Sequence, residues 1–265
     1  MKTILTALLL SCLPLTAFCG SGQLNILFII TDDMYTWQMN FMPDGEGKNY
    51  TPNIDRLAEE GTVMRKQYVS STVCTPSRYS AMTGRYASRS QDPRFVENTE
   101  KLGQSHVQWN TFADPMREKT VAHRLAAAGY RTGFVGKDHV ILTPGHENLG
   151  LSSNAKDPAV QAAMRQNAEA SRAAFKQAGF EFVDRVYHNN PDFNGSKTLA
   201  VHNQDWVTEG ALEFLEQDDD RPFFLYFATT IPHGPTAPER SWNADRRATP
   251  EGWLDSVPEV QPDAE

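Results

Sequence analysis

The chain has 265 residues and a formal net charge of −8, because 33 Asp and Glu residues outnumber 25 Lys and Arg residues. A surface of this sign does not attract nucleic acid or a bulk anionic polymer through its overall field, so we expect no nucleic-acid partner. An anionic ligand would have to be held by a local cluster of cations or by a metal ion.

The N-terminal 19 residues have the character of a signal peptide. Met1-Lys2-Thr3 is a short positive start, and an interrupted apolar stretch follows and ends at Phe18. The stretch is too short and too broken for a membrane span. We therefore predict a signal peptide over 1–19, a mature domain over 20–265, and a secreted or periplasmic protein. Removal of the signal peptide would leave Cys74 as the single cysteine, so no internal disulfide could form.

Apolar runs that predict strands alternate with helical patterns along the rest of the chain. The run over 24–30 is nearly continuous, which is typical of a strand buried on both faces. Thr51-Pro52 begins a helix that Gly61 ends, and a strand over 63–69 leads to Cys74. Further on, the patterns predict a helix over 120–128, strands over 130–135 and 180–187, a helix over 198–216 and a strand over 222–228.

This alternation predicts an α/β fold with a largely parallel central sheet flanked by helices. The apolar strand 223–227 is expected to be the last strand of the sheet and to leave an open edge. The longest helix is expected within 198–216. We expect segment 86–111 to be a long connection that shapes the binding pocket. We expect segment 148–178 to be a polar, Ala-rich insert.

Polar residues follow the expected strands at positions where they could converge. Asp32-Asp33 come after the first strand, Gly136-Lys137-Asp138-His139 after a later one, and Pro232-His233-Gly234-Pro235 after the last. In open α/β sheets, binding sites form beyond the carboxyl ends of the strands. Adjacent aspartates also occur as turn residues or helix caps, but hard carboxylate oxygens are what calcium prefers. Both can reach one ion only if the backbone bends between them.

The most informative motif is Cys74-Thr75-Pro76-Ser77-Arg78, followed at fixed spacing by Thr83-Gly84-Arg85. A lone cysteine is usually a small, inert, buried residue. Here Pro76 suits the first turn of a helix that Gly84 ends. Arg78 lies four residues after Cys74 and can approach the same face of that helix. The free N–H groups and positive dipole end of a helix N-terminus suit an anion such as sulfate.

Together these motifs resemble those of type I sulfatases, which belong to the alkaline phosphatase-like superfamily. The resemblance spans residues 25–238 and implies a sulfuric ester hydrolase that acts on a sulfated small molecule or glycan. It implies that a formylglycine-generating (sulfatase-maturing) enzyme oxidises Cys74 to formylglycine, whose hydrated aldehyde attacks the ester. It also implies a calcium ion, Ca2+, held by Asp32 and Asp33 beside the modified Cys74.

The same resemblance implies a role for each remaining motif residue. Arg78 would orient the modified residue and compensate charge, and Lys137 would bind sulfate oxygens. His139 would assist proton removal from the gem-diol, and His233 would contact the sulfate or protonate the leaving alcohol. Asp138 departs from the family pattern, where an aromatic residue is common. The remaining histidines have no matching context and are interpreted as ordinary: His106, His123, His146, His188 and His202.

The resemblance covers only the front half of a typical sulfatase. The Asp-Asn pair that completes the calcium shell in the family has no assignable counterpart after His233, so we expect a truncated N-terminal domain. Two alternatives stay open: a phosphonate or phosphate ester hydrolase of the same superfamily, and a catalytically inactive fragment that binds anions. Sulfate and phosphate esters are near-isosteric, so the motif residues alone separate these substrates poorly.

Overall fold

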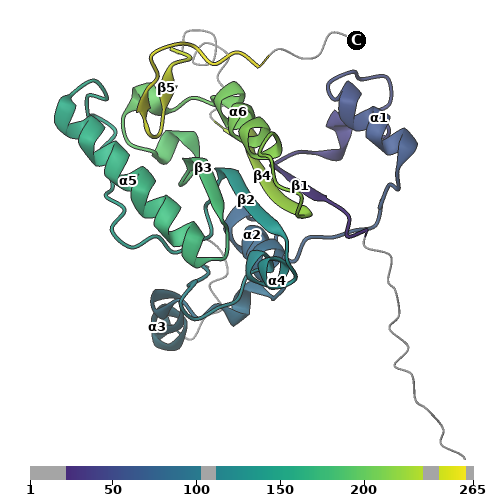
Figure 1. The fold of residues 1–265 in the computed structure, drawn as a ribbon, viewed down its shortest axis with the longest axis horizontal. Helices are drawn as coiled ribbons and strands as arrows, with labels where there is room; N and C mark the ends of the chain where they lie inside the picture. Colours follow the sequence, from purple (N-terminus) through teal and green to yellow (C-terminus); the bar gives the residue numbers. More distant parts are fainter. Residues whose placement is uncertain (1–21, 103–111, 235–244, 261–265) are drawn as a thin grey trace, which may run out of the picture.

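A four-stranded sheet lies at the centre of the protein (Figure 1). The computed structural model describes residues 22–102, 112–234 and 245–260, so the predicted signal peptide over 1–19 lies outside the described residues. Neighbouring strands are parallel, in the order β1–β4–β2–β3. This confirms the predicted α/β fold with a largely parallel sheet. The strands are β1 (Ile26–Asp32), β2 (Arg131–Lys137), β3 (Phe182–Tyr187) and β4 (Phe223–Pro232).

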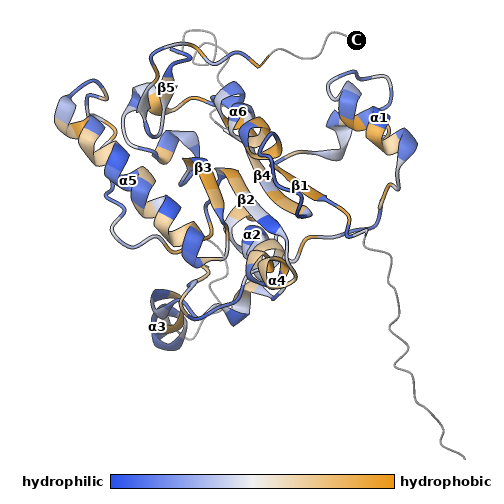
Figure 2. Cartoon of the chain, viewed as in Figure 1, coloured by the Kyte–Doolittle hydropathy of each residue, from blue (hydrophilic) through white to orange (hydrophobic). Residues whose placement is uncertain are grey.

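Helices cover both faces of this sheet. Helices α2, α4 and α5 share one apolar cluster with it, in which the rings of Phe134 and Phe175 stack 3.9 Å apart. Helix α6 packs on the opposite face through Trp206 and Phe214. Figure 2 shows the apolar residues concentrated in the strands. Full burial of a phenylalanine side chain such as Phe134 or Phe214 contributes about 1.5–3 kcal/mol to stability. The helices are α1 (Pro52–Glu60), α2 (Cys74–Thr83), α3 (Pro93–Leu102), α4 (Val121–Ala127), α5 (Pro158–Gln177) and α6 (Gln204–Leu215).

Helix ends follow the signals in the sequence. Helix α2 ends at Gly84, which has a positive φ of 68° that glycine adopts without strain. Helix α4 begins after Thr120, whose side chain accepts a hydrogen bond from the His123 amide. A short hairpin, β5 (Ala248–Thr249) and β6 (Gly252–Trp253), follows near the end of the described chain. No helix of the described ranges combines the length and apolar character that a membrane span requires.

Strands β3 and β1 form the two edges of the sheet, and β1 is the edge with exposed apolar side chains, so two predictions about the strands are wrong. Strand β4 was expected to be that edge, but it lies between β1 and β2, and Leu225 is fully buried. Strand β1 was expected to be buried on both faces, but Leu27 and Ile29 are each 49% exposed. The apolar composition of a segment indicates a strand, but it does not show which strands will lie beside it in the sheet. Figure 1 shows α1 beyond β1, apart from the other helices.

The strand predicted over 63–69 is absent. This segment follows α1 as an irregular stretch in which Met64 is 70% and Tyr68 is 87% exposed. Residues with β-propensity form a strand only where a neighbouring strand pairs with them, and this segment has no such neighbour among the described residues.

The predicted lengths of the helices are also wrong in two places. The longest helix of the described residues is α5, with 20 residues, inside the segment interpreted as a polar insert. Its buried side includes Asn167 and Ser171 beside two alanines, so its apolar pattern is weak in the sequence. The helix expected over 198–216 begins only at Gln204, because Asn203 caps it. Within the expected connection 86–111, residues Pro93–Leu102 form α3, and 103–111 lie outside the described residues.

Candidate active site

The predicted site residues meet at the carboxyl end of the sheet. Asp32 is the last residue of β1, Lys137 is the last of β2, and His233 directly follows β4. Cys74 is the first residue of α2. Direct contacts join the seven residues that the sequence analysis selected into two neighbouring groups. Cys74 contacts His139, and one further side chain described below completes the links among Asp32, Asp33, Arg78, Lys137 and His233.

Two of these residues sit where the backbone bends sharply. Asp33 has φ of 60° and His139 has φ of 55°, values that residues other than glycine seldom adopt. The pairing of β1 with β4 also shifts its register between Ile30 and Asp32. The bend required for the two adjacent aspartates to act at one place is therefore present. Such backbone conformations cost about 1–3 kcal/mol each and cluster at functional sites.

The side chains of Cys74 and His139 are in contact. The Sγ atom of Cys74 lies 3.3 Å from Nδ1 of His139. Burial, and then the charges of Lys137 and Arg78, lower the pKa of His139 to about 3. The imidazole is therefore neutral at physiological pH and has a lone pair that can accept a proton.

A buried cluster of three charges lies directly behind this pair. Arg78 Nη2 is 3.4 Å from Asp32 Oδ1, Lys137 Nζ is bonded to Asp32 Oδ2, and Arg78 Nη1 donates to the Lys137 carbonyl at 3.1 Å. The three residues are at most 2% exposed. Burial alone would raise the pKa of Asp32, but the Arg78 and Lys137 charges outweigh it and hold that pKa below its usual value.

This cluster carries an excess of positive charge, since two cations surround one carboxylate. Burial, and then repulsion by Arg78, lower the pKa of Lys137 against the attraction of Asp32. Arg78 Nη2 is buried and finds no hydrogen-bond acceptor in the described part of the chain. A buried donor without an acceptor is costly, and an anion bound here would satisfy it.

Asn190 completes the set of contacts, and the sequence analysis did not select it. Its Oδ1 accepts a hydrogen bond from Lys137 Nζ, and its Nδ2 lies 3.3 Å from Nε2 of His233. Nε2 of His233 lies 3.5 Å from Asp33 Oδ2. Asn190 follows β3 in the chain, so its place after a strand was the signal that could have identified it. The sequence analysis predicted that a strand ends at Tyr187, as β3 does, but it assigned no role to the residues that follow this strand.

Asp138 and His188 support the turn that carries His139. Asp138 Oδ1 accepts hydrogen bonds from the amides of Val140 and Ile141 at 3.0 and 2.7 Å. Its Oδ2 lies 3.3 Å from Nδ1 of His188, whose carbonyl accepts from the His139 amide at 3.1 Å. The carboxylate thus caps the turn where the family often has an aromatic residue. The interpretation of His188 as ordinary overlooked this contact.

Comparison with known proteins assigns the chain to a family. A sequence model of the family described as Sulfatase matches residues 24–257. The chain belongs to the sulfatase family. It is 30% identical over 242 residues to the N-acetylgalactosamine-6-sulfatase of Canis lupus familiaris, covering 88% of this chain and 44% of that protein.

Other relatives agree in extent with this match. The multifunctional alkaline phosphatase superfamily protein PehA of Trinickia caryophylli is 26% identical over 253 residues, covering 84% of this chain and 45% of PehA. Among solved structures, a protein from work on the metabolism of multiple glycosaminoglycans by Bacteroides thetaiotaomicron has a TM-score of 0.51 at 20% identity. That match covers 82% of this chain and 52% of the other, and it shows the fold. This sulfatase chain therefore spans about half the length of the proteins it matches.

Two residues of this sulfatase chain have the oxygen ligands that calcium prefers, but they supply only part of its coordination shell. Asp32 and Asp33 supply hard carboxylate oxygens, and the side chain of Asp33 is 50% exposed. Calcium takes six to eight oxygen ligands. In the residues that the structure describes, no group of three His, Cys, Asp or Glu side chains could hold a metal ion. The two aspartates alone therefore do not complete a calcium site.

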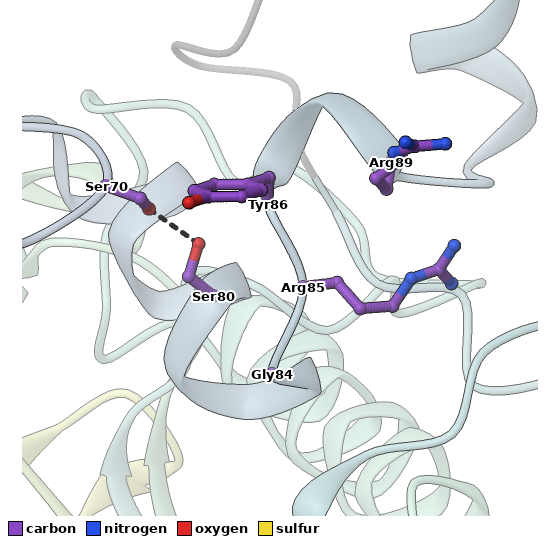
Figure 3. Close-up of a pocket in the computed structure, with 6 residues that line it drawn as sticks. All are labelled: Ser70, Ser80, Gly84, Arg85, Tyr86 and Arg89. Carbon is purple, nitrogen blue, oxygen red and sulfur yellow. Dashed lines mark hydrogen bonds between the residues drawn. The ribbon is translucent and has the colours of Figure 1, made fainter.

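One surface pocket lies at each end of helix α2. An open pocket of about 480 Å³ lies at its N-terminus and is lined by Asp32, Asp33, Cys74 and Arg78, among others. A second pocket, of about 590 Å³, lies at its C-terminus and contains none of the predicted site residues (Figure 3). Arg85 of the Thr-Gly-Arg extension lines this second pocket and forms an ion pair of 3.4 Å with buried Glu118. The motif thus reaches the pocket at the N-terminus of α2 only through its first half.

Proposed function

We propose that this chain is the nucleophile-bearing part of a sulfatase that hydrolyses sulfate esters by a formylglycine formed from Cys74. The observation that carries the proposal is the contact of 3.3 Å between Cys74 Sγ and the neutral His139, at the N-terminus of α2. A buried cluster with excess positive charge adjoins this pair. A nucleophile, a base and a site for an anion are the three elements that ester hydrolysis of this kind needs.

Each residue has a defined task in this proposal. Formylglycine supplies a hydrated aldehyde whose hydroxyl oxygen attacks the sulfate ester. His139 accepts a proton at the position that Sγ occupies here, because its depressed pKa keeps it neutral. Lys137 and Arg78 hold the sulfate oxygens and balance their charge. His233 contacts the sulfate or protonates the leaving alcohol, and its place after β4 supports that role.

We also propose calcium as the metal, with Asp32, Asp33 and the modified Cys74 among its ligands. The support is the adjacent pair of carboxylates and the half-exposed Asp33, which opens toward the pocket. Further oxygen ligands would have to come from other residues, from backbone carbonyls or from water. No step of the proposal is routed through the ion.

The substrate and cellular location follow from the same proposal. The relatives include an N-acetylgalactosamine-6-sulfatase, which supports a sulfated glycan or a sulfated small molecule as the substrate. A sulfatase-maturing enzyme would be a required partner, because Cys74 must be oxidised. The apolar N-terminal segment supports export to the periplasm or the medium.

A phosphonate or phosphate ester hydrolase is the second candidate, and the match to PehA favours it. The discriminating experiment co-expresses the chain with a maturing enzyme and compares the hydrolysis of an aryl sulfate with that of an aryl phosphate diester. Faster turnover of the sulfate supports the proposal, and faster turnover of the diester replaces it with the second candidate. Loss of turnover in Cys74→Ala would show that the activity belongs to this site. Absence of both activities would favour the inactive, anion-binding alternative.

A further inference from the structure

Asn190 is held rigidly beside the charged cluster. It is 3% exposed, and it precedes a short 3-10 helix, η3 (Pro191–Phe193). Its amide donates to the side chain of Asn189 at 2.7 Å. Its carbonyl accepts from the Phe193 amide at 2.9 Å and from the Asn194 side chain at 3.2 Å. With both backbone groups engaged, its carboxamide is aimed by the fold rather than by a free rotamer.

The orientation of this carboxamide is fixed by chemistry. The Lys137 ammonium can only donate hydrogen bonds, so the atom that contacts it must be the Asn190 oxygen. The Asn190 nitrogen then faces Nε2 of His233, 3.3 Å away. His233 is held from its other side, since its Nδ1 lies 2.9 Å from the Gly234 carbonyl. One side chain after β3 therefore sets the positions of residues carried by β2 and β4.

The contacts of Lys137 leave one donor free. Its ammonium has three N–H groups, and two of them point to Asp32 and Asn190. No hydrogen-bond acceptor for the third lies within the described ranges, and Arg78 Nη2 makes only the 3.4 Å ion pair with Asp32 Oδ1 and no hydrogen bond there. Two cationic donors are thus left over beside Cys74, which is the arrangement that an anionic oxygen requires.

Whether residue 190 carries a charge decides how strongly these donors attract an anion. Arg78, Lys137 and Asp32 together carry one positive charge in excess, and the neutral Asn190 leaves it intact. A carboxylate at the same place would accept the same hydrogen bond from Lys137 but would cancel the excess charge. Electrostatic interactions between buried groups are screened little, so this difference would weaken anion binding strongly.

We propose that Asn190 is a positioning residue of the sulfate site. Its neutral carboxamide fixes the ammonium of Lys137 without neutralising it, so that the free N–H of Lys137 binds a sulfate oxygen. The assignment rests on the proposed function for the place of the sulfate, and it adds a residue that lies outside the motifs.

The test measures the affinity of the full chain for inorganic sulfate by titration calorimetry, without requiring turnover. Asn190→Asp is isosteric, keeps the acceptor for Lys137 and adds a negative charge. We expect it to weaken sulfate binding about tenfold or more, while its resistance to urea stays at least equal to that of the wild type. Asn190→Leu should weaken both sulfate binding and stability. Asn154→Asp makes the same change at an exposed asparagine that accepts from the Lys156 amide, and should alter neither.

A double-mutant cycle identifies Lys137 as the group through which Asn190 acts. In the Lys137→Met background, Asn190→Asp should have little remaining effect on sulfate affinity. The proposal is overturned if Asn190→Asp binds sulfate as the wild type does, fails to fold, or loses the same affinity in both backgrounds. It is also overturned if the wild type binds sulfate no better than Lys137→Met. A chain that meets the expectations yet hydrolyses no aryl sulfate would contradict the proposed function and leave this role of Asn190 standing.

Discussion

The Sγ atom of Cys74 lies 3.3 Å from Nδ1 of His139, although 65 positions separate the two residues in the chain. Cys74 reaches this place as the first residue of α2, and His139 reaches it through a turn with positive φ after β2. The contact joins a helix N-terminus, which favours negative charge, to a neutral imidazole that can take up a proton. It is the geometric reason to regard Cys74 as a reactive residue rather than a buried structural one.

Cys74 should be converted to formylglycine when the chain is made together with a sulfatase-maturing enzyme. The reason is the intact Cys74–Arg78 motif on a helix whose N-terminus lines an open pocket. Mass spectrometry of the peptide that contains residue 74 should show the loss expected for exchange of the thiol for an aldehyde. Cys74→Ala should fold as the wild type does, because the thiol is only partly buried. An unmodified thiol after co-expression would contradict the assignment of the nucleophile.

Arg78 should matter for stability as well as for anion binding. Arg78→Met leaves the buried Asp32 with Lys137 as its remaining cationic partner, and breaking a buried ion pair in this way costs about 3–5 kcal/mol. Arg247→Met is the matched control, since the side chains of Arg247 and of its partner Asp245 are 44% and 33% exposed. It should cost less than about 1 kcal/mol. Equal free energies of unfolding for the two variants, measured in urea, would argue against a structural role for the buried cluster.

The sequence predicted which polar residues meet at the end of the sheet more fully than it predicted the sheet itself. Residues such as Asp32, Lys137 and His233 follow apolar runs directly, and the ends of parallel strands must meet at one edge. Asn190 escaped because a single asparagine after a strand is an ordinary loop residue until its contacts are known. The order of the strands could not be read either, since the runs of β1 and β4 are equally apolar and only packing decides which one is central.

The stability of the protein should depend on His139 in mildly acidic solution. Its pKa is about 3 in the folded protein against an ordinary value of 6.5, so the unfolded state binds more protons between those values. The stabilisation is complete above about pH 6.5 and is lost as the pH falls toward 3, by up to about 1.4 kcal/mol per pH unit. His139→Gln should therefore flatten the dependence of the unfolding free energy on pH between about 6.5 and 5, above the range where carboxylates titrate. An unchanged slope would show that His139 is not held neutral.

Gly136 should be irreplaceable at the register shift of β2, directly before Lys137. Its φ is 94°, and a Cβ atom there would collide with the Ala228 carbonyl of β4. Gly145 is the matched control, because its φ is 82° but open space surrounds its Cα. Gly145→Ala should cost about 1 kcal/mol for backbone strain alone. Gly136→Ala should cost well over twice as much, because β2 must also move away from β4. Similar costs in urea unfolding would show that the close approach of the two strands is not needed.

The open edge at β1 should make the chain associate with itself. Strand β1 pairs only with β4 among the described strands, and Leu27 and Ile29 are each 49% exposed on it. An apolar strand with a free edge is a template for further pairing. Residues 20–265 should therefore show a mass that rises with concentration in analytical ultracentrifugation. Ile29→Lys should shift the chain toward the monomer, because a charge on an edge strand opposes pairing and desolvation. Leu151→Lys is the control, because Leu151 is 54% exposed but lies in a turn and not on a strand. This substitution should leave the association unchanged. A chain that stays monomeric at all concentrations, or that responds equally to both substitutions, would show that β1 is not the surface through which it associates.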